Sequence, residues 1–330
     1  MLSKNNKIVN PRAIKILLEW AFLGLKEVSL SPELDAEVIL SSVIGKNMEY
    51  LRAHPEKIVS QDKAFKFKKF IERRIKHEPV AYIVGKKEFY GLNFKVNKNT
   101  LIPRSETELI VDEVLKIIEE DKKKSDILLF DVGAGSGCIP IAIAKSLEHI
   151  YGYRYINSKI RLCAGDISKK TLDIARDNAK MNKAAKYINF FKGDMLENFS
   201  VNIKLSKIQT LKHKKIIFIT ANLPYLSEEI YNKCSKDIRM YEPKNALIAG
   251  KDGLKYYKKL FREAKNLRFF AVSQSEKTIS SNLWDGIILC EIDPSQKEPI
   301  KNLTKKYFPN ASLQIKKDLA GLDRLAIIRL

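Results

Sequence analysis

The sequence has few of the residues that build metal centres or disulfide frameworks. Its 330 residues include four cysteines and four histidines, with no Cys-x-x-Cys pair. They stand far apart, at Cys138, Cys163, Cys234, Cys290, His54, His77, His149 and His213. Metal sites draw their ligands from closely spaced motifs, so we expect no metal. Scattered cysteines beside apolar segments predict reduced, buried thiols in a cytosol-type compartment.

Long apolar runs are missing as well. Nowhere does the chain carry an uncharged apolar stretch of membrane-spanning length, so we expect no membrane insertion. The first residues, Met-Leu-Ser-Lys-Asn-Asn-Lys-Ile, lack the apolar core of a secretory signal. We therefore expect a cytoplasmic protein, with an organelle of bacterial descent as the second choice.

Positive charge is in excess, with a net charge of +21 and a pI near 9.6. Such a charge suits nucleic-acid binding. However, lysine, isoleucine and asparagine are all abundant, the composition that an AT-rich genome gives to an ordinary enzyme. The lysines also spread along the whole chain instead of forming one stripe with interleaved aromatic residues. Direct nucleic-acid binding stays open, but we do not expect it.

The first 85 residues predict a helical domain. Amphipathic spacing indicates a helix over 13–24, and Ser31-Pro32 opens a second helix that Gly45 ends. A third, strongly basic helix is expected over 63–75; its charges suit a solvated face, or a surface for an acidic or RNA-linked partner. Two strand-like runs, 80–85 and 89–96, then suggest a hairpin that connects the domains at about 80–100.

From residue 86 to residue 330 the pattern predicts an α/β domain. Strand-like and helical segments alternate over 127–130, 138–147, 160–165, 169–182, 188–191, 216–219, 253–264, 269–273, 286–291, 296–308 and 325–330. This alternation favours a Rossmann-like, doubly wound parallel sheet with helices on both faces. The lysine-rich, weakly patterned stretch 197–215 suggests a surface insertion.

A glycine loop follows the first strand of this domain. It comprises Asp131, Gly133, Ala134, Gly135, Ser136 and Gly137, with a helical pattern directly behind it. Glycines allow positive φ and let a ligand approach the bare backbone. The tight Gly-x-Gly-x-Gly spacing lacks the later glycine of the dinucleotide fingerprint, which favours S-adenosylmethionine. The carboxylate of Asp131 could then steer the ammonium group of that ligand.

Acidic residues also follow the next two strands. Asp166 ends the strand about thirty residues after the loop, where a carboxylate suits the paired hydroxyls of a ribose. The alternative interpretation of Asp166 is a helix N-cap. Asp194-Met195 closes the third strand, and one of these two would face the adenine ring; the alternative is a simple turn.

The segment Asn222-Leu223-Pro224-Tyr225 follows the fourth strand and predicts the reaction. An amide nitrogen is a poor nucleophile because its lone pair is delocalised into the carbonyl. Two acceptors that hold both N–H hydrogens would aim that lone pair at a sulfonium methyl group. The Asn222 side-chain oxygen and a backbone carbonyl of the turn can supply them. Pro224 would stiffen the turn, and the ring of Tyr225 would cover the face of the substrate amide.

These motifs, with the segments Ile102–Glu108, Glu78–Gly85, Tyr241-Glu242-Pro243 and Asp318–Arg324, closely resemble the HemK/PrmC family. Its members are peptide-chain release factor glutamine methyltransferases, and the similarity runs over nearly the whole chain. The resemblance implies transfer of a methyl group from S-adenosylmethionine to the glutamine side-chain amide in the Gly-Gly-Gln motif of bacterial-type release factors. It places the family's cofactor loop on Gly133–Gly137, the ribose aspartate on Asp166, the adenine-side residue on Met195, and the catalytic turn on Asn222–Tyr225. It also implies that the helical domain recognises the release factor, and we expect a monomer.

The sequence departs from the family pattern at three positions. The family turn is usually Asn-Pro-Pro-Tyr, whereas this chain has Leu223 in place of the first proline. Met195 stands where the family often has an aromatic residue, and Ser105 replaces a usual proline. Asn-Leu-Pro-Tyr also occurs in ribosomal-RNA adenine dimethyltransferases, which are the alternative. Those enzymes usually have a glutamate at the place of Asp166 and carry their accessory helices after the catalytic domain.

Overall fold

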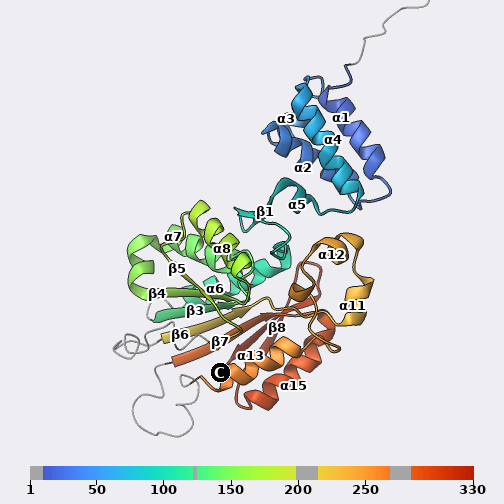
Figure 1. The fold of residues 1–330 in the computed structure, drawn as a ribbon. Helices are drawn as coiled ribbons and strands as arrows, with labels where there is room; N and C mark the ends of the chain where they lie inside the picture. Colours follow the sequence, from blue (N-terminus) through green and yellow to red (C-terminus); the bar gives the residue numbers. More distant parts are fainter. Residues whose placement is uncertain (1–9, 122–124, 198–214, 268–283) are drawn as a thin grey trace, which may run out of the picture. The chain divides into compact units, whose positions relative to one another are not determined.

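The computed structural model describes residues 10–121, 125–197, 215–267 and 284–330 (Figure 1). The chain divides into two compact units. The first comprises Met1–Lys86 and Ser235–Tyr241, and the second comprises Lys87–Cys234 and Glu242–Leu330.

The first unit consists of helices around one apolar core. The helices are α1 (Ile14–Leu25), α2 (Pro32–Ile44), α3 (Met48–Ala53), α4 (Gln61–Ile75), α5 (Val80–Val84) and α12 (Lys236–Tyr241). The core side chains include Leu17, Ile39 and Phe67, one from each of the three long helices. Gly45 ends α2 with φ of +75°, a backbone conformation that glycine adopts without strain. The predicted helices over 13–24 and 63–75 and the one opened by Ser31 are therefore confirmed.

The predicted strand over 80–85 is wrong, because Val80–Val84 forms the short helix α5. Pro79 precedes the helix and Gly85, with φ of +77°, ends it. Tyr82 and Ile83 are buried, so packing overrides the β-preference of the valines and isoleucine. The hairpin exists, but it lies later, between β1 (Lys86–Phe89) and β2 (Leu92–Lys95).

The second unit contains a seven-stranded sheet with the order β5-β4-β3-β6-β7-β9-β8. Its strands are β3 (Asp126–Val132), β4 (Ile160–Asp166), β5 (Ile188–Lys192), β6 (Lys215–Ala221), β7 (Trp284–Glu291), β8 (Ser312–Lys317) and β9 (Asp323–Arg329). β3 to β7 are mutually parallel, whereas β9 runs antiparallel to β7 and to β8. The α/β fold with a mostly parallel sheet is confirmed.

Helices cover both faces of this sheet, as Figure 1 shows. The α-helices among the described residues of this unit are α6 (Glu108–Glu120), α7 (Cys138–Lys159), α8 (Lys169–Met181), α11 (Glu228–Lys233), α13 (Lys255–Lys265) and α15 (Lys297–Tyr307), and the 3-10 turns are η1 (Ser105–Thr107), η2 (Lys244–Ala246) and η3 (Pro294–Gln296). Successive strand residues point to opposite faces. Leu129 accordingly packs in one core with α6 and α7, and Phe130 in a second core with α13 and α15.

The edge strand β8 was not predicted, because its residues alternate between exposed and half-buried and include two lysines. The strand predicted over 269–273 and most of the insertion predicted over 197–215 lie outside the described residues. Within the described residues, no helix is both long and apolar enough to span a bilayer.

Candidate active site

The glycine loop joins β3 to α7 at the carboxyl edge of the sheet. Gly133, Gly135 and Gly137 all have positive φ, of +75°, +55° and +79°. The backbone N–H groups of Gly133 and Ala134 both donate to the Gly165 carbonyl, each at 2.9 Å. These two hydrogen bonds fix the loop to the end of β4. A side chain at any of the three glycines would strain the backbone.

Buried side chains support the same loop from behind. Asn178, fully buried on α8, donates through Nδ2 to the carbonyls of Ser136 (2.9 Å) and Lys95 (3.0 Å). Its Oδ1 accepts from the Lys95 backbone N–H at 2.7 Å. One asparagine therefore connects the loop, α8 and the hairpin strand β2, although sequence reasoning did not single it out.

Asp131 carries a buried carboxylate near the end of β3. Its Oδ1 accepts from the Thr220 hydroxyl at 2.9 Å. Its Oδ2 is also buried and has no hydrogen-bond partner among the described residues. Burial chiefly raises the pKa of Asp131 to about 7; the Thr220 bond lowers it, and the charge of Asp166 raises it further. An unpaired buried oxygen of this kind suits a cationic ligand group.

Asp166 is the last residue of β4. Its carboxylate accepts from the backbone N–H groups of Gly135 (3.1 Å) and Ser168 (2.8 Å). Burial raises the pKa of Asp166, and these two hydrogen bonds lower it. The N-cap interpretation of Asp166 is wrong, because the cap of α8 is Ser168, whose hydroxyl accepts from Thr171 N–H. Asp166 instead ties the glycine loop to the end of the neighbouring strand.

Asp194 and Met195 follow β5 and differ sharply from each other. The Asp194 carboxylate pairs with Lys259 at 2.6 Å. Met195 is buried in the same core as Phe191 and Leu223, with an unusual positive φ of +55°. The carboxylate of Asp194 is thus engaged elsewhere, which favours Met195 over Asp194 as the adenine-side residue.

The turn Asn222–Tyr225 follows β6, the neighbour of β3. Val132 and Ala221 are paired across the two strands, so the glycine loop and the turn start side by side. A Cβ atom placed on Gly133 would lie 3.2 Å from Cδ2 of Leu223. The structure therefore brings together the two motifs that lie far apart in the sequence.

Side chains from distant segments hold this turn in place. Asn222 donates through Nδ2 to the Thr107 hydroxyl oxygen at 2.8 Å. Thr107 donates in turn to Oε2 of Glu291 at 2.6 Å, and the Tyr225 hydroxyl donates to Oε1 of Glu291 at 3.0 Å. The Gln296 side chain donates to the Tyr225 carbonyl at 2.9 Å. Burial raises the pKa of Tyr225, and Glu291 raises it further, so the phenol stays protonated.

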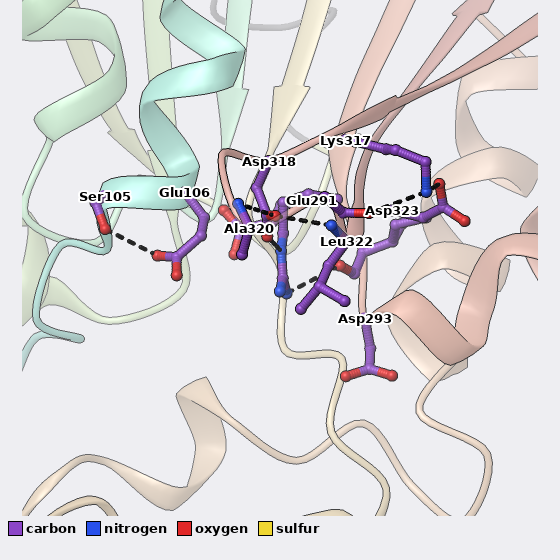
Figure 2. A network of polar contacts seen from close by, with 12 residues as sticks. Ser105, Glu106, Glu291, Asp293, Lys317, Asp318, Ala320, Leu322 and Asp323 are labelled. Carbon is purple, nitrogen blue, oxygen red and sulfur yellow. Dashed lines mark hydrogen bonds and ion pairs between the residues drawn. The ribbon is translucent and has the colours of Figure 1, made fainter.

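Three of the segments quoted for the family resemblance contribute polar contacts within the second unit. Glu242 receives hydrogen bonds from the Ile102 backbone N–H at 3.1 Å and from Arg104. Figure 2 shows the closing segment, in which Asp318 accepts from the backbone N–H groups of Ala320 and Leu322. Asp318 also accepts from Nε of Arg324, whose charge acts on Glu291 and Tyr225.

Sequence reasoning missed the residues that support the turn, namely Thr107, Glu291 and Gln296. One signal was available, because Glu291 ends a predicted strand. A carboxylate at the carboxyl end of a parallel strand faces the same edge as Asp131, Asp166 and Asn222. Thr107 lies inside a segment that was used only for its family likeness. The described residues contain no group of His, Cys, Asp and Glu able to hold a metal ion.

A glycine loop and an Asn-Leu-Pro-Tyr turn at one edge of a mostly parallel sheet define a site of the methyltransferase class. The comparisons with known proteins agree. Residues 17–85 match the family model described as the PrmC N-terminal domain. The release factor glutamine methyltransferase of Bacillus subtilis is 34% identical over 311 residues, which cover 93% of this chain and 94% of the relative. That of Coxiella burnetii is 32% identical over 305 residues, covering 92% and 94%.

The chain therefore belongs to the release factor glutamine methyltransferase family, and the protein is an enzyme. The resemblance inferred from the sequence is thereby confirmed. Among solved structures, the N-terminal domain of human METTL16 in complex with SAH aligns with a TM-score of 0.43 and 13% identity, covering 100% of this chain and 98% of that one.

Proposed function

We propose that this enzyme methylates the side-chain amide nitrogen of the glutamine in the Gly-Gly-Gln motif of bacterial-type peptide chain release factors. The observation that carries the proposal is the orientation of Asn222. Its NH₂ group is bound to Thr107, and its Oδ1 accepts no hydrogen bond from the described residues. Oδ1 is therefore available as an acceptor next to the glycine loop, where an amide N–H can bind it.

The second acceptor of the proposed mechanism is the Leu223 carbonyl. No backbone hydrogen bond to it occurs within the described part of the chain. With one N–H on Asn222 Oδ1 and the other on this carbonyl, the acceptor nitrogen loses conjugation and its lone pair is aimed at the loop. The Tyr225 hydroxyl is bound to Glu291, which leaves the ring to cover the amide plane.

The residues of the glycine loop fit S-adenosylmethionine, which supplies an electrophilic methyl group when bound. Positive φ at Gly133 and Gly135 leaves the backbone bare where a Cβ would stand. The unpaired Oδ2 of Asp131 would hold the ammonium group, Asp166 the ribose hydroxyls, and Met195 the adenine face. Ala134, Ser136 and Gly137 would complete the loop around the ligand.

The first unit would supply recognition of the release factor. Its match to the PrmC N-terminal domain and its solvent-facing basic helix α4 support this role. Lys66 and Lys69 are exposed on α4, and their ammonium groups lie 5.4 Å from the ring centroids of Phe70 and Phe65. A monomer suffices for this scheme, because the chain itself contains both the loop and the turn.

One experiment tests the function directly. The protein is incubated with methyl-labelled S-adenosylmethionine and one of three acceptors: a release factor, the same factor with the motif glutamine replaced by glutamate, or ribosomal RNA. We expect label only in the first factor, with a mass gain of one methyl group on that glutamine. Label in RNA alone would establish the alternative, an adenine exocyclic-amine methyltransferase, and overturn the proposal.

A further inference from the structure

Glu291 is a buried carboxylate at the end of β7. In the proposed mechanism it does not contact the glutamine amide that is methylated. Its side chain is 2% exposed. Each carboxylate oxygen accepts one hydroxyl: Oε2 accepts from Thr107 at 2.6 Å, and Oε1 accepts from Tyr225 at 3.0 Å. A buried carboxylate costs free energy unless its oxygens are paired, so both hydroxyl protons are committed to it.

That commitment determines how Asn222 is oriented. A hydroxyl has one proton, and the proton of Thr107 is given to Glu291, so its oxygen can only accept from Asn222. The side-chain amide must therefore present its NH₂ group to Thr107, at the 2.8 Å that the structure shows. The two orientations of an asparagine amide have nearly the same shape, and hydrogen-bond partners alone select between them. In the opposite orientation, NH₂ instead of Oδ1 would face the acceptor.

We propose that Glu291 is a positioning residue which, through Thr107, sets the amide of Asn222 with Oδ1 toward the acceptor nitrogen and, through the Tyr225 hydroxyl, holds the ring of the same turn. This inference rests on the proposed function. It adds two residues, Glu291 and Thr107, that orient the turn before the substrate binds. The turn is then preorganised and does not have to be ordered during the reaction.

Opposing influences act on the pKa of the Glu291 carboxyl group. Burial is the largest and raises the pKa above its usual value, as does the charge of Glu106, whereas the hydrogen bonds from Thr107 and Tyr225 and the charge of Arg324 offset part of this rise. Tyr257 donates to the backbone carbonyl of Glu291 and fixes the main chain at the end of β7. The hydrogen-bond geometry has both hydroxyls donating to the carboxylate, one to each oxygen.

The test compares turnover in matched variants of the full-length enzyme. Thr107→Val keeps the branched shape but removes the hydroxyl, and Thr107→Ser keeps the hydroxyl. The Thr107 side chain makes no capping bond to α6, so valine does not remove a helix cap. Glu291→Gln keeps the shape but replaces one acceptor oxygen by an NH₂ donor. Glu113→Gln is the control, since Glu113 is another buried carboxylate, 3% exposed, that binds Lys316 of β8 and makes no hydrogen bond to the turn among the described residues.

We expect Thr107→Val and Glu291→Gln each to lower kcat by ~10–100-fold, the range for groups that orient a reacting residue. The KM for the release factor and the Kd for S-adenosylmethionine should stay near the wild-type values. Thr107→Ser should restore most of the turnover. Glu113→Gln should leave kcat unchanged, whatever its effect on the melting temperature. The double variant of Thr107→Val and Glu291→Gln should have a kcat only slightly below that of either single variant, because both substitutions break the same chain of hydrogen bonds from Glu291 through Thr107 to Asn222.

Wild-type kcat in Thr107→Val would overturn the inference, even where Glu291→Gln did not fold. So would a serine variant as slow as the valine variant, because the hydroxyl would then not be the active feature. The wild-type enzyme tests the proposed function separately. If it labels RNA instead of the release factor, the function is wrong, and the same kcat ratios measured on RNA decide the role of Glu291. A wild-type protein that labels neither acceptor overturns both proposals.

Discussion

The glycine loop and the Asn222 turn lie at the same edge of the sheet, but different kinds of contact stabilise them. The loop is held by β4 and α8, which follow it in the chain: the Gly165 carbonyl accepts from Gly133 and Ala134, and the side chains of Asp166 and Asn178 bind Gly135 and Ser136 across 31 and 42 residues. The turn is held by side chains from distant segments: 115 residues separate Asn222 from Thr107, and 66 separate Tyr225 from Glu291. The proposed cofactor side of the site is thus built from consecutive elements of the chain, whereas the proposed acceptor side depends on segments that are further apart in the sequence.

The largest effect is expected when a side chain is introduced into the glycine loop. Gly133→Val should abolish S-adenosylmethionine binding, because valine opposes the φ of +75° and its side chain would meet Leu223. Calorimetric titration with the ligand measures this. Gly152→Ala is the control, because Gly152 also has positive φ but no atom lies within 4 Å of a built Cβ. Near-normal affinity in Gly133→Val would show that the ligand does not approach this part of the loop.

Substitutions in the Asn222 turn should instead lower turnover and spare cofactor binding. Asn222→Ala should reduce turnover by ~10²–10³, the range for losing one preorganised transition-state hydrogen bond, and leave cofactor affinity nearly intact. Single-turnover kinetics and calorimetry on the same preparation separate the two quantities. If the alanine variant methylated glutamine at the wild-type rate, Asn222 would not accept a hydrogen bond from the reacting amide. The adenine alternative would then be tested next.

The same distinction explains which parts of the fold could be predicted. Alternating strands and helices after residue 126 carry their signal in neighbouring residues, and β3, β4, β6 and β9 were placed close to their true positions. The segment Val80–Val84 was misassigned because burial of Tyr82 and Ile83, not local preference, decides its conformation. The edge strand β8 escaped notice because its apolar alternation is short, with Leu313 and Ile315 followed by two lysines.

The candidate site divides in a similar way. Asp131, Asp166 and Asn222 stand at strand ends, so their common edge could be inferred from the order of the elements alone. The partners of Asn222 could not, because nothing local indicates that Thr107 and Glu291 meet. Whether an acidic residue at a strand end binds ligand, supports a neighbour or caps a helix depends on side-chain directions that only the folded structure specifies.

A pH titration sharpens the comparison on the cofactor side. The pKa of Asp131 is raised to about 7, chiefly by burial, so its carboxylate is charged above that pH and neutral below it. An ammonium group binds the charged form, so affinity should be fully present above pH 7 and fall by ~tenfold for each unit below it. Calorimetry from pH 5.5 to pH 8 measures this dependence.

Asp131→Asn is the matched variant for that titration, because it keeps the shape and removes the charge. Its affinity should be low at pH 8 and should lack the fall below pH 7. Titration of the ligand's own amino group is common to both proteins, so the difference between the two curves isolates Asp131. Parallel curves would exclude a contact between this carboxylate and the ammonium group.

The helical unit should influence the acceptor and not the cofactor. Replacing both Lys66 and Lys69 by glutamate should raise the KM for the release factor by ~two- to tenfold, the scale of two exposed charge contacts. Cofactor affinity should not change. Lys305→Glu with Lys306→Glu, a pair of exposed lysines on α15, is the control. Equal KM values for the two double variants would remove α4 from the recognition surface.

The smallest effect is expected at Leu223. Leu223→Pro should retain turnover, because the mechanism needs only the carbonyl of this residue and proline keeps it. The Leu223 N–H, which proline lacks, makes no backbone hydrogen bond among the described residues. The cost should be confined to packing against Gly133, ~1 kcal/mol, about the value of one buried methylene group. A large fall in kcat, measured under saturating cofactor and release factor, would mean that the leucine side chain or its N–H takes part, and that the acceptor side also depends on local structure.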